Sequence, residues 1–394
     1  MKSEWTKKKL SDIADFNPRE TIKKGAIAKK IPMDVLRPFY RDIPYYVEEG
    51  FSGGTKFRNG DTIMARITPC LENGKTAQVS ILNDGEVGFG STEYIVFRAK
   101  EGIADKDYLY YLVCSPEVRE PAIKSMVGSS GRQRVQTDVV KNLEIDVPPL
   151  VEQRKIGSFL KSIDDKIALN DKINKNLEQQ AQALFHSLFI ENANPTWKDG
   201  VLSDLGTVVA GGTPSKTKPE YYSKQGIAWI TPKDLSLNKS KFISHGEIDI
   251  SELGFSKSSA TKMPTGTVLF SSRAPIGYIA IAANEVTTNQ GFKSVVPNKN
   301  IGTAFIYYLL KFLLPTIEGM ASGSTFKEIS GAGMKSVPVV IPDNETIEKF
   351  NAFCTPILQQ QEVLEAENSR LADIRDALLP KLMSGDLDVS DLDL

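Results

Sequence analysis

The sequence predicts an α+β protein built as a tandem duplication, in which two globular domains alternate with two long helices. Its 394 residues are 41% hydrophobic and 25% charged, which is ordinary globular composition and suits more than one domain with a buried core. The two halves repeat at a nearly constant offset. An apolar stripe of helical spacing closes each half. These observations divide the chain into residues 1–150 (domain 1), 151–194 (spacer helix 1), 195–343 (domain 2) and 344–394 (spacer helix 2 and a C-terminal tail).

The duplication is visible as identical residues in the two halves. A shift of 192 residues matches Trp5 with Trp197 and the Leu-Ser-Asp triplet at 10–12 with that at 202–204. A shift of 194 aligns identical residues across the later part of each half, at Ser130/Ser324, Lys141/Lys335, Pro148/Pro342, Lys155/Lys349, Phe159/Phe353, Asn174/Asn368 and Leu188/Leu382. A run of this length at one offset predicts two copies of one structural unit.

Each globular domain combines short strand-like runs with glycine and proline breaks and with short helices. We expect strands at 62–65 and 94–97 in domain 1 and at 267–270 and 278–281 in domain 2, and helices at 107–113 and 303–314.

The spacer segments show apolar residues at alternating steps of three and four, which is typical of a coiled-coil seam. The predicted seam residues are Ile156, Leu160, Ile163, Ile167, Asn174, Leu177, Leu184, Phe350, Ile357, Leu364, Asn368, Leu371 and Leu378. Asn170 and Asn174 fill two intervening seam positions. Asn174 and Asn368 occupy matched positions, so they either set the register or are tolerated polar defects. Thr355-Pro356 resembles an N-cap with a first-turn proline, so helix 2 is expected to restart there. Pro380 is expected to bend or end the last turn.

Two helices with apolar seams most simply pair with each other. Antiparallel pairing would give the single chain an approximate twofold symmetry, and two equivalent surfaces would then recruit two copies of one partner.

Charge and cysteine content restrict the class of protein. The net charge is −1, but domain 1 carries 23 Lys/Arg against 21 Asp/Glu, domain 2 carries 15 against 11, and residues 344–394 carry 4 against 11. Both domains are therefore mildly basic, and the acidic excess lies at the C-terminal end. The three dispersed cysteines predict neither disulfides nor a thiolate metal site. The absence of a signal peptide and of long apolar runs predicts a cytoplasmic protein with no membrane contact.

A search for catalytic motifs leaves none that is credible. Gly74-Lys75-Thr76 lacks the upstream glycine of a phosphate-binding loop, because position 69 is proline. The two histidines, His186 and His245, belong to no metal-binding pattern. We therefore expect no catalytic residue, cofactor site or metal site in this chain.

Polar and basic loops are the remaining candidates. For each one alone, ordinary loop or surface structure is the favoured interpretation, and their joint presence in both domains is what indicates DNA contact. Hydroxyls, backbone amides and cations suit phosphate, whereas Arg suits guanine and Asn or Gln suits adenine. The candidate DNA contacts are Arg66, Lys75, Arg132, Arg134, Thr213, Ser215, Lys216, Lys233, Arg273, Asn289, Lys293 and Lys327. The segment 130–135 differs from its copy 324–329 even in charge sign, which suggests that the two domains read different targets.

Several stretches resemble the specificity subunit of type I restriction-modification systems, and the resemblance covers nearly the whole chain. They are Pro-Pro-Leu-Val-Glu-Gln-Arg-Lys-Ile at 148–156, Gln-Ala-Leu-Phe at 182–185, Trp-Ile-Thr-Pro-Lys-Asp-Leu at 229–235, Thr-Asn-Gln-Gly-Phe at 288–292 and Leu-Leu-Pro-Lys-Leu-Met-Ser-Gly at 378–385. The second copy of the first motif departs from it, with Ile-Pro-Asp-Asn at 341–344.

The resemblance implies that each domain is a target recognition domain for one half of a bipartite, asymmetric site in double-stranded DNA. It implies that the spacer helices set the unread gap and dock two adenine-N6 methyltransferase subunits. S-adenosylmethionine, ATP and Mg would belong to those subunits and to a restriction subunit that translocates and cuts DNA. Two alternatives remain open: a coiled-coil scaffold with two protein-binding domains, and an enzyme with an unrecognised site.

Overall fold

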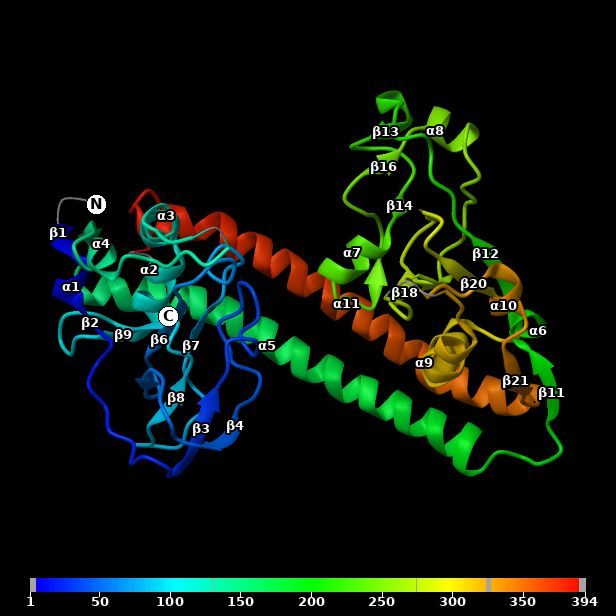
Figure 1. Ribbon diagram of the computed structural model, residues 1–394, viewed down its shortest axis with the longest axis horizontal. Helices are drawn as coiled ribbons and strands as arrows, with labels where there is room; N and C mark the ends of the chain where they lie inside the picture. The colour runs from blue at the N-terminus through cyan, green and yellow to red at the C-terminus, as the bar shows by residue number, and fades with distance from the viewer. Residues whose placement is uncertain (1–4, 130, 274, 324–326, 390–394) are drawn as a thin grey trace. The chain divides into compact units, whose positions relative to one another are not determined.

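The computed structural model describes residues 5–129, 131–273, 275–323 and 327–389 (Figure 1). The chain forms two compact units. Unit 1 comprises Met1–Asn170 and Glu367–Leu394, and unit 2 comprises Asp171–Ala366. Each unit thus contains one globular domain and a part of each long helix. The predicted α+β duplication with two long helices is confirmed.

Domain 1 is built from two four-stranded sheets and a short terminal ribbon. The sheet orders are β2-β9-β6-β7 and β4-β3-β8-β5, and β1 pairs with β10. The strands are β1 Thr6–Lys9, β2 Ala14–Phe16, β3 Ile27–Ile31, β4 Val47–Gly50, β5 Lys56–Phe57, β6 Thr62–Ala65, β7 Thr76–Gln78, β8 Gly88–Gly90, β9 Tyr94–Ala99 and β10 Glu144–Val147. The helices are α1 Leu10–Ile13, α2 Lys106–Cys114, α3 Pro116–Lys124 and α4 Thr137–Lys141.

Helix α2 joins the sheet of domain 1 to the start of spacer helix 1. It begins at an N-cap, where the Asp105 carboxylate accepts hydrogen bonds from the Asp107 and Tyr108 amides. Its tyrosines and leucines pack into the same core as Ile156 and Leu160 of the spacer helix. The first turns of that helix are therefore part of the domain 1 core.

Domain 2 has one five-stranded sheet and three short ribbons. The sheet order is β12-β20-β17-β18-β15, and the ribbons are β11-β21, β13-β16 and β14-β19. The strands are β11 Lys198–Val201, β12 Gly206–Ala210, β13 Tyr222–Ser223, β14 Trp229–Ile230, β15 Phe242–Ile243, β16 Asp249–Ile250, β17 Val268–Phe270, β18 Ile279–Ala282, β19 Thr287–Thr288, β20 Lys293–Pro297 and β21 Pro338–Ile341. The helices are α6 Leu202–Leu205, η3 Pro219–Tyr221, α7 Pro232–Leu237, α8 Glu252–Ser256, α9 Thr303–Met320 and α10 Gly331–Lys335.

The repeat appears again in the element boundaries. Strands β1 and β11 pair antiparallel with β10 and β21, the last strands of their domains. The bounds of α10 and β21 lie 194 residues after those of α4 and β10. The indole of Trp5 donates to Glu152 at 3.1 Å, and that of Trp197 donates to Asp343 at 2.7 Å, so both matched tryptophans anchor the start of a long helix.

The long helices are α5, Leu150–His186, which continues into the π-helical turn η2, Ser187–Glu191, and α11, Asn344–Met383. Helix α11 is continuous through Pro356, so the expected restart there is wrong. A proline inside a helix costs about 3 kcal/mol, but Cys354, Ile357 and Leu358 are buried around it. That packing keeps the helix intact. The helix ends one turn after Pro380.

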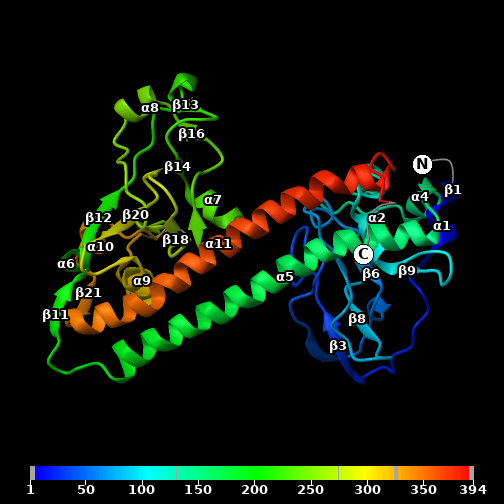
Figure 2. The same cartoon turned by 180° about the vertical axis from the view of Figure 1, so that it is seen from behind.

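Within unit 1, residues 150–170 of α5 run antiparallel to residues 367–383 of α11, and the two helices lie side by side in both views (Figures 1 and 2). Within unit 2, the Gln361 side chain of α11 donates to the Asn174 carbonyl of α5. Most predicted seam residues are buried: Ile156, Leu160, Ile163, Ile167, Phe350, Ile357 and Leu364. The others are half-buried: Asn174, Leu177, Leu184, Asn368, Leu371 and Leu378.

The polar layer of the seam is centred on Asn170, one of the two asparagines expected there, and not on Asn174. Asn170 is completely buried, and its amide donates to Asn368 at 2.9 Å and to Glu367 at 2.8 Å. Asn174, the residue matched to Asn368 by the repeat, is only half-buried. Residue numbers run in opposite directions along an antiparallel pair, so matched positions of the repeat are staggered and do not face each other.

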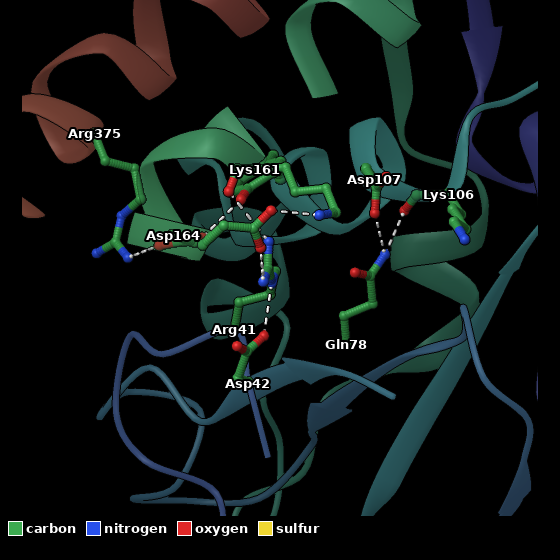
Figure 3. A network of polar contacts seen from close by, with 10 residues as sticks. Arg41, Asp42, Gln78, Lys106, Asp107, Lys161, Asp164 and Arg375 are labelled. Atoms are coloured by element: carbon green, nitrogen blue, oxygen red, sulfur yellow. Dashed lines mark hydrogen bonds and ion pairs between the residues drawn. The ribbon is translucent and has the colours of Figure 1, made fainter. Parts of the chain in front are cut away.

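A polar network attaches domain 1 to the helices of unit 1 (Figure 3). Arg41 is buried, and its guanidinium contacts Asp42 at 2.8 Å and Asp165 of α5 at 2.5 Å. Asp164, one residue earlier, accepts from the Tyr111 hydroxyl at 2.6 Å and from Arg375 of α11 at 2.7 Å. The domain, α5 and α11 are therefore connected through adjacent carboxylates.

Unit 2 contains a comparable network with different residues. Lys241 is buried and contacts Glu178 of α5 and Gln361 of α11. Tyr308 belongs to the Tyr-Tyr-Leu triplet at 307–309, which repeats the triplet at 110–112 that contains Tyr111. Its hydroxyl donates to Glu178 at 2.8 Å, and Lys311 contacts the other Glu178 oxygen at 2.6 Å. Burial alone would raise the pKa of Glu178, but the two ammonium groups outweigh it and lower that pKa to about 2.

Candidate nucleic-acid interface

Four of the candidate DNA contacts line one cavity in domain 2. Thr213, Lys216, Lys233 and Asn289 come from the loop after β12, the start of α7 and the end of β19. The cavity has a volume of about 610 Å³, and the aromatic side chains of Trp229 and Tyr222 also line it. Residues that are far apart in the sequence thus converge because three strand ends meet here.

Close packing of the backbone brings these loops together. A Cβ atom on Gly211 would lie 1.9 Å from the Asn289 carbonyl oxygen, so only glycine allows the two loops to approach this closely. Helix α7 begins with a capping box, in which the Thr231 amide and hydroxyl both donate to Asp234 at 2.7 Å. The cap directs the Thr-Pro-Lys-Asp segment toward the cavity.

The two lysines at the cavity, Lys233 and Lys216, differ in whether an acidic side chain pairs with them. Lys233 is exposed and pairs with Glu247 at 2.5 Å, and this contact raises the pKa of Lys233. Lys216 and Ser215 are exposed, and the Ser215 hydroxyl lies 2.9 Å from that of Thr217. These groups are accessible to a phosphate or to a base edge.

A second group of candidates forms a charge cluster beside β20. Arg273 contacts Glu328 at 3.0 Å, and Lys293 lies 3.7 Å from the same carboxylate. Arg273 is exposed, but Lys293 is buried, and its burial lowers its pKa. Lys327, next to Glu328, is exposed. Residues 324–326 of this segment lie outside the described residues.

Domain 1 has a comparable cluster, in which the charge at one matched position is reversed. Arg134, which the repeat aligns with Glu328, pairs with Glu93 at 2.6 Å and lowers the pKa of that carboxyl. Arg66 directly follows β6 and donates to the Val135 carbonyl at 3.0 Å. Arg132 is exposed on the segment next to Arg134, whereas Ser130 lies outside the described residues. The two clusters have the same framework and different charge patterns.

Lys75 is placed differently from the other candidates. Its ammonium donates to the Met33 carbonyl at 2.9 Å, and the side chain is half-buried within domain 1. The Lys75 ammonium is therefore already hydrogen-bonded within domain 1.

Sequence reasoning missed several residues of these sites. Gln290 and Glu247 line the domain 2 cavity, and Glu93 and Glu328 are the acidic members of the clusters. Gln290 is adjacent to a chosen residue, so its position was a usable signal. The glutamates gave no such signal, because an acidic residue is not expected to face DNA.

Among the described residues, no three His, Cys, Asp or Glu side chains form a group able to hold a metal ion. None of the described helices is both long and apolar enough to cross a membrane.

Comparisons with known proteins agree with the duplicated architecture. Residues 2–179 and 194–367 each match the type I restriction modification DNA specificity domain. The HindI specificity subunit of Haemophilus influenzae is 24% identical over 84% of this chain and 87% of its own length. The MjaIX specificity subunit of Methanocaldococcus jannaschii is 38% identical, over 43% of this chain and 41% of its own length.

A solved structure shows the same fold. The type I restriction-modification S subunit from M. genitalium has a TM-score of 0.61 at 17% identity, covering 96% of both chains. The family match extends over both repeats and most of the sequence. The chain therefore belongs to the type I restriction-modification specificity subunit family.

Proposed function

We propose that this chain is the non-catalytic, DNA-reading subunit of a type I restriction-modification complex in the cytoplasm. Each globular domain reads one half of a bipartite, asymmetric site in double-stranded DNA. The observation that carries the proposal is the pair of matching clusters. One is Arg66, Glu93 and Arg134, and the other is Arg273, Lys293 and Glu328.

Two domains on one framework with different exposed chemistry suit two different half-sites. Each cluster carries two cations and one carboxylate, so each keeps a net positive charge for phosphate. The exchange of Arg134 for Glu328 changes the pattern of hydrogen-bond donors and acceptors at the matched position. Bases are distinguished by such patterns in the major groove, whereas phosphate contacts set the register.

The spacer helices provide matched surfaces for a partner. Leu169 on α5 is 52% exposed, and Val363 on α11, 194 residues later, is 58% exposed. Large apolar side chains that are exposed at matched positions of a repeat suit two copies of one partner. We assign that partner as a DNA adenine methyltransferase subunit, which would hold S-adenosylmethionine. A restriction subunit would supply ATP-driven, Mg-dependent translocation and cleavage.

A map of N6-methyladenine tests this function. The full chain is produced with its methyltransferase partner in cells without other adenine methylation. Methylation of one asymmetric bipartite motif is the expected result. Replacing residues 1–150 with the corresponding domain of a relative should change one half of the motif and leave the other intact. A motif that changes in both halves, or no motif with the partner expressed, contradicts the proposal and favours a protein-binding scaffold.

A further inference from the structure

The domain 2 cavity presents several side-chain hydrogen-bond donors that have no partner among the described residues. Both oxygens of the Asp234 carboxylate accept hydrogen bonds, one from Thr231 and the other from the Glu247 amide at 2.9 Å. Glu247 in turn is paired with Lys233. Both acids of the cavity therefore contact groups of domain 2 itself, Asp234 through both oxygens and Glu247 through one.

The aromatic residues of the cavity also have satisfied polar atoms. The Trp229 indole donates to the Gly212 carbonyl at 2.9 Å, and the Tyr222 hydroxyl donates to the Pro214 carbonyl at 2.8 Å. What these two side chains offer a ligand is their apolar ring surface. Water is less available beside such surfaces, so an unmatched polar group there is more costly.

The two amide side chains at the cavity have their oxygens engaged. Asn289 Oδ1 accepts from the Gly291 backbone amide at 2.8 Å, and since that amide can only donate, the atom facing it must be the oxygen. The Thr213 hydroxyl donates to Gln290 Oε1. Among the described residues, Asn289 Nδ2, Gln290 Nε2 and Lys216 Nζ have no acceptor, so three donors remain for a ligand.

We propose that this cavity reads an edge that offers acceptors only, namely the O6 and N7 edge of a guanine in the half-site of domain 2. The inference rests on the proposed DNA-reading function and deepens it. Bidentate recognition of adenine by Asn or Gln needs an amide oxygen to accept from N6 and an amide nitrogen to donate to N7. Here both amide oxygens already accept a hydrogen bond within the domain, so the three unpaired donors suit the acceptor edge of guanine better than the mixed edge of adenine.

The substitution Asn289→Asp tests the assignment, because it replaces one donor by an acceptor of the same size. The carboxylate still accepts from the Gly291 amide, so the turn keeps its hydrogen bond. Asn284→Asp is the matched control, because it makes the same charge change at an exposed position of domain 2 outside the cavity lining. Thermal unfolding followed by circular dichroism checks that both variants fold.

The measurement is the base preference at each position of the site. The full chain in complex with its methyltransferase partner methylates a duplex library in which the recognised site is varied one base pair at a time. The wild-type complex should require guanine in one half. Asn289→Asp should reduce the preference for that guanine on the order of 10- to 100-fold, shift it toward a base with a major-groove amino group, and leave the other half unchanged. Asn284→Asp should behave as the wild type.

Three results would overturn the inference. One is a wild-type motif with only A·T pairs in both halves. Another is an Asn289→Asp complex with unchanged preference at every position. The third is uniform weakening on all sequences, which would mean that the donors contact phosphate. A wild-type complex that shows no bipartite motif would instead refute the proposed function, and the inference with it.

Discussion

Removal of Arg375 should destabilise unit 1 strongly, because it leaves a buried carboxylate without its cation. Asp164 is 5% exposed, and Arg375 is 8% exposed. Their contact is 2.7 Å long, and the other Asp164 oxygen accepts from the buried Tyr111 hydroxyl at 2.6 Å. Breaking a buried ion pair from one side costs about 3–5 kcal/mol. Arg375→Ala should therefore lower the free energy of unfolding by about that amount.

The second copy of the repeat supplies the compensating change. At the 194-residue offset, Asp164 corresponds to Leu358 and Arg375 corresponds to Ala181, and both of these residues are buried in unit 2. The double variant Asp164→Leu/Arg375→Ala therefore grafts an apolar pair that the same fold already accommodates. It should regain part of the loss, since a well-packed apolar pair often equals a buried ion pair in stability.

Tyr111 limits the recovery of the double variant. Without Asp164, its buried hydroxyl has lost its acceptor, which costs about 1–3 kcal/mol. Adding Tyr111→Phe removes that hydroxyl and should bring the triple variant close to the wild type.

Urea unfolding followed by circular dichroism at 222 nm measures all four proteins, and Arg370→Ala is the control on the exposed face of α11. The control should change the free energy of unfolding by less than about 0.5 kcal/mol. The reasoning is refuted if Arg375→Ala is as mild as the control. It is also refuted if the triple variant is as unstable as Arg375→Ala alone.

Three further predictions concern the helices. The pKa of Glu178 is lowered from an ordinary 4.5 to about 2, so its stabilising contribution is complete above pH 4.5 and is lost as the pH falls toward 2. In Glu178→Gln, the free energy of unfolding should therefore depend less on pH across that interval. Urea unfolding at each pH measures this. Leu169→Asp or Val363→Asp should each reduce the number of methyltransferase subunits bound per chain from two to one, and the double variant should bind none. Native mass spectrometry counts the bound subunits, and an unchanged number would mean that the methyltransferase docks elsewhere on the chain. Inserting four residues next to Asn174 should lengthen the gap of the methylated motif or abolish methylation, and a motif of unaltered spacing would show that the helices do not set the gap.

The sequence alone determined the architecture, because architecture here rests on repetition and periodicity. The offset of 194 residues reappears in the bounds of α10 and β21, and the three-four apolar spacing reappears as the buried seam of α5 and α11. Such patterns arise from which residues must be buried, and burial follows the period of each element. They required no knowledge of which residues face each other.

Only the tertiary structure decided the pairings. Asn368 faces Asn170 instead of its matched Asn174 because antiparallel helices stagger the repeat, and Pro356 stays within α11 because the surrounding side chains are buried. Lys75 carried the same sequence signal as Lys216, yet its ammonium is bound within domain 1 while Lys216 is exposed at the cavity. Hydrogen bonds and ion pairs depend on positions to within about 1 Å, and loops far apart in the chain acquire those positions only when the whole domain has packed.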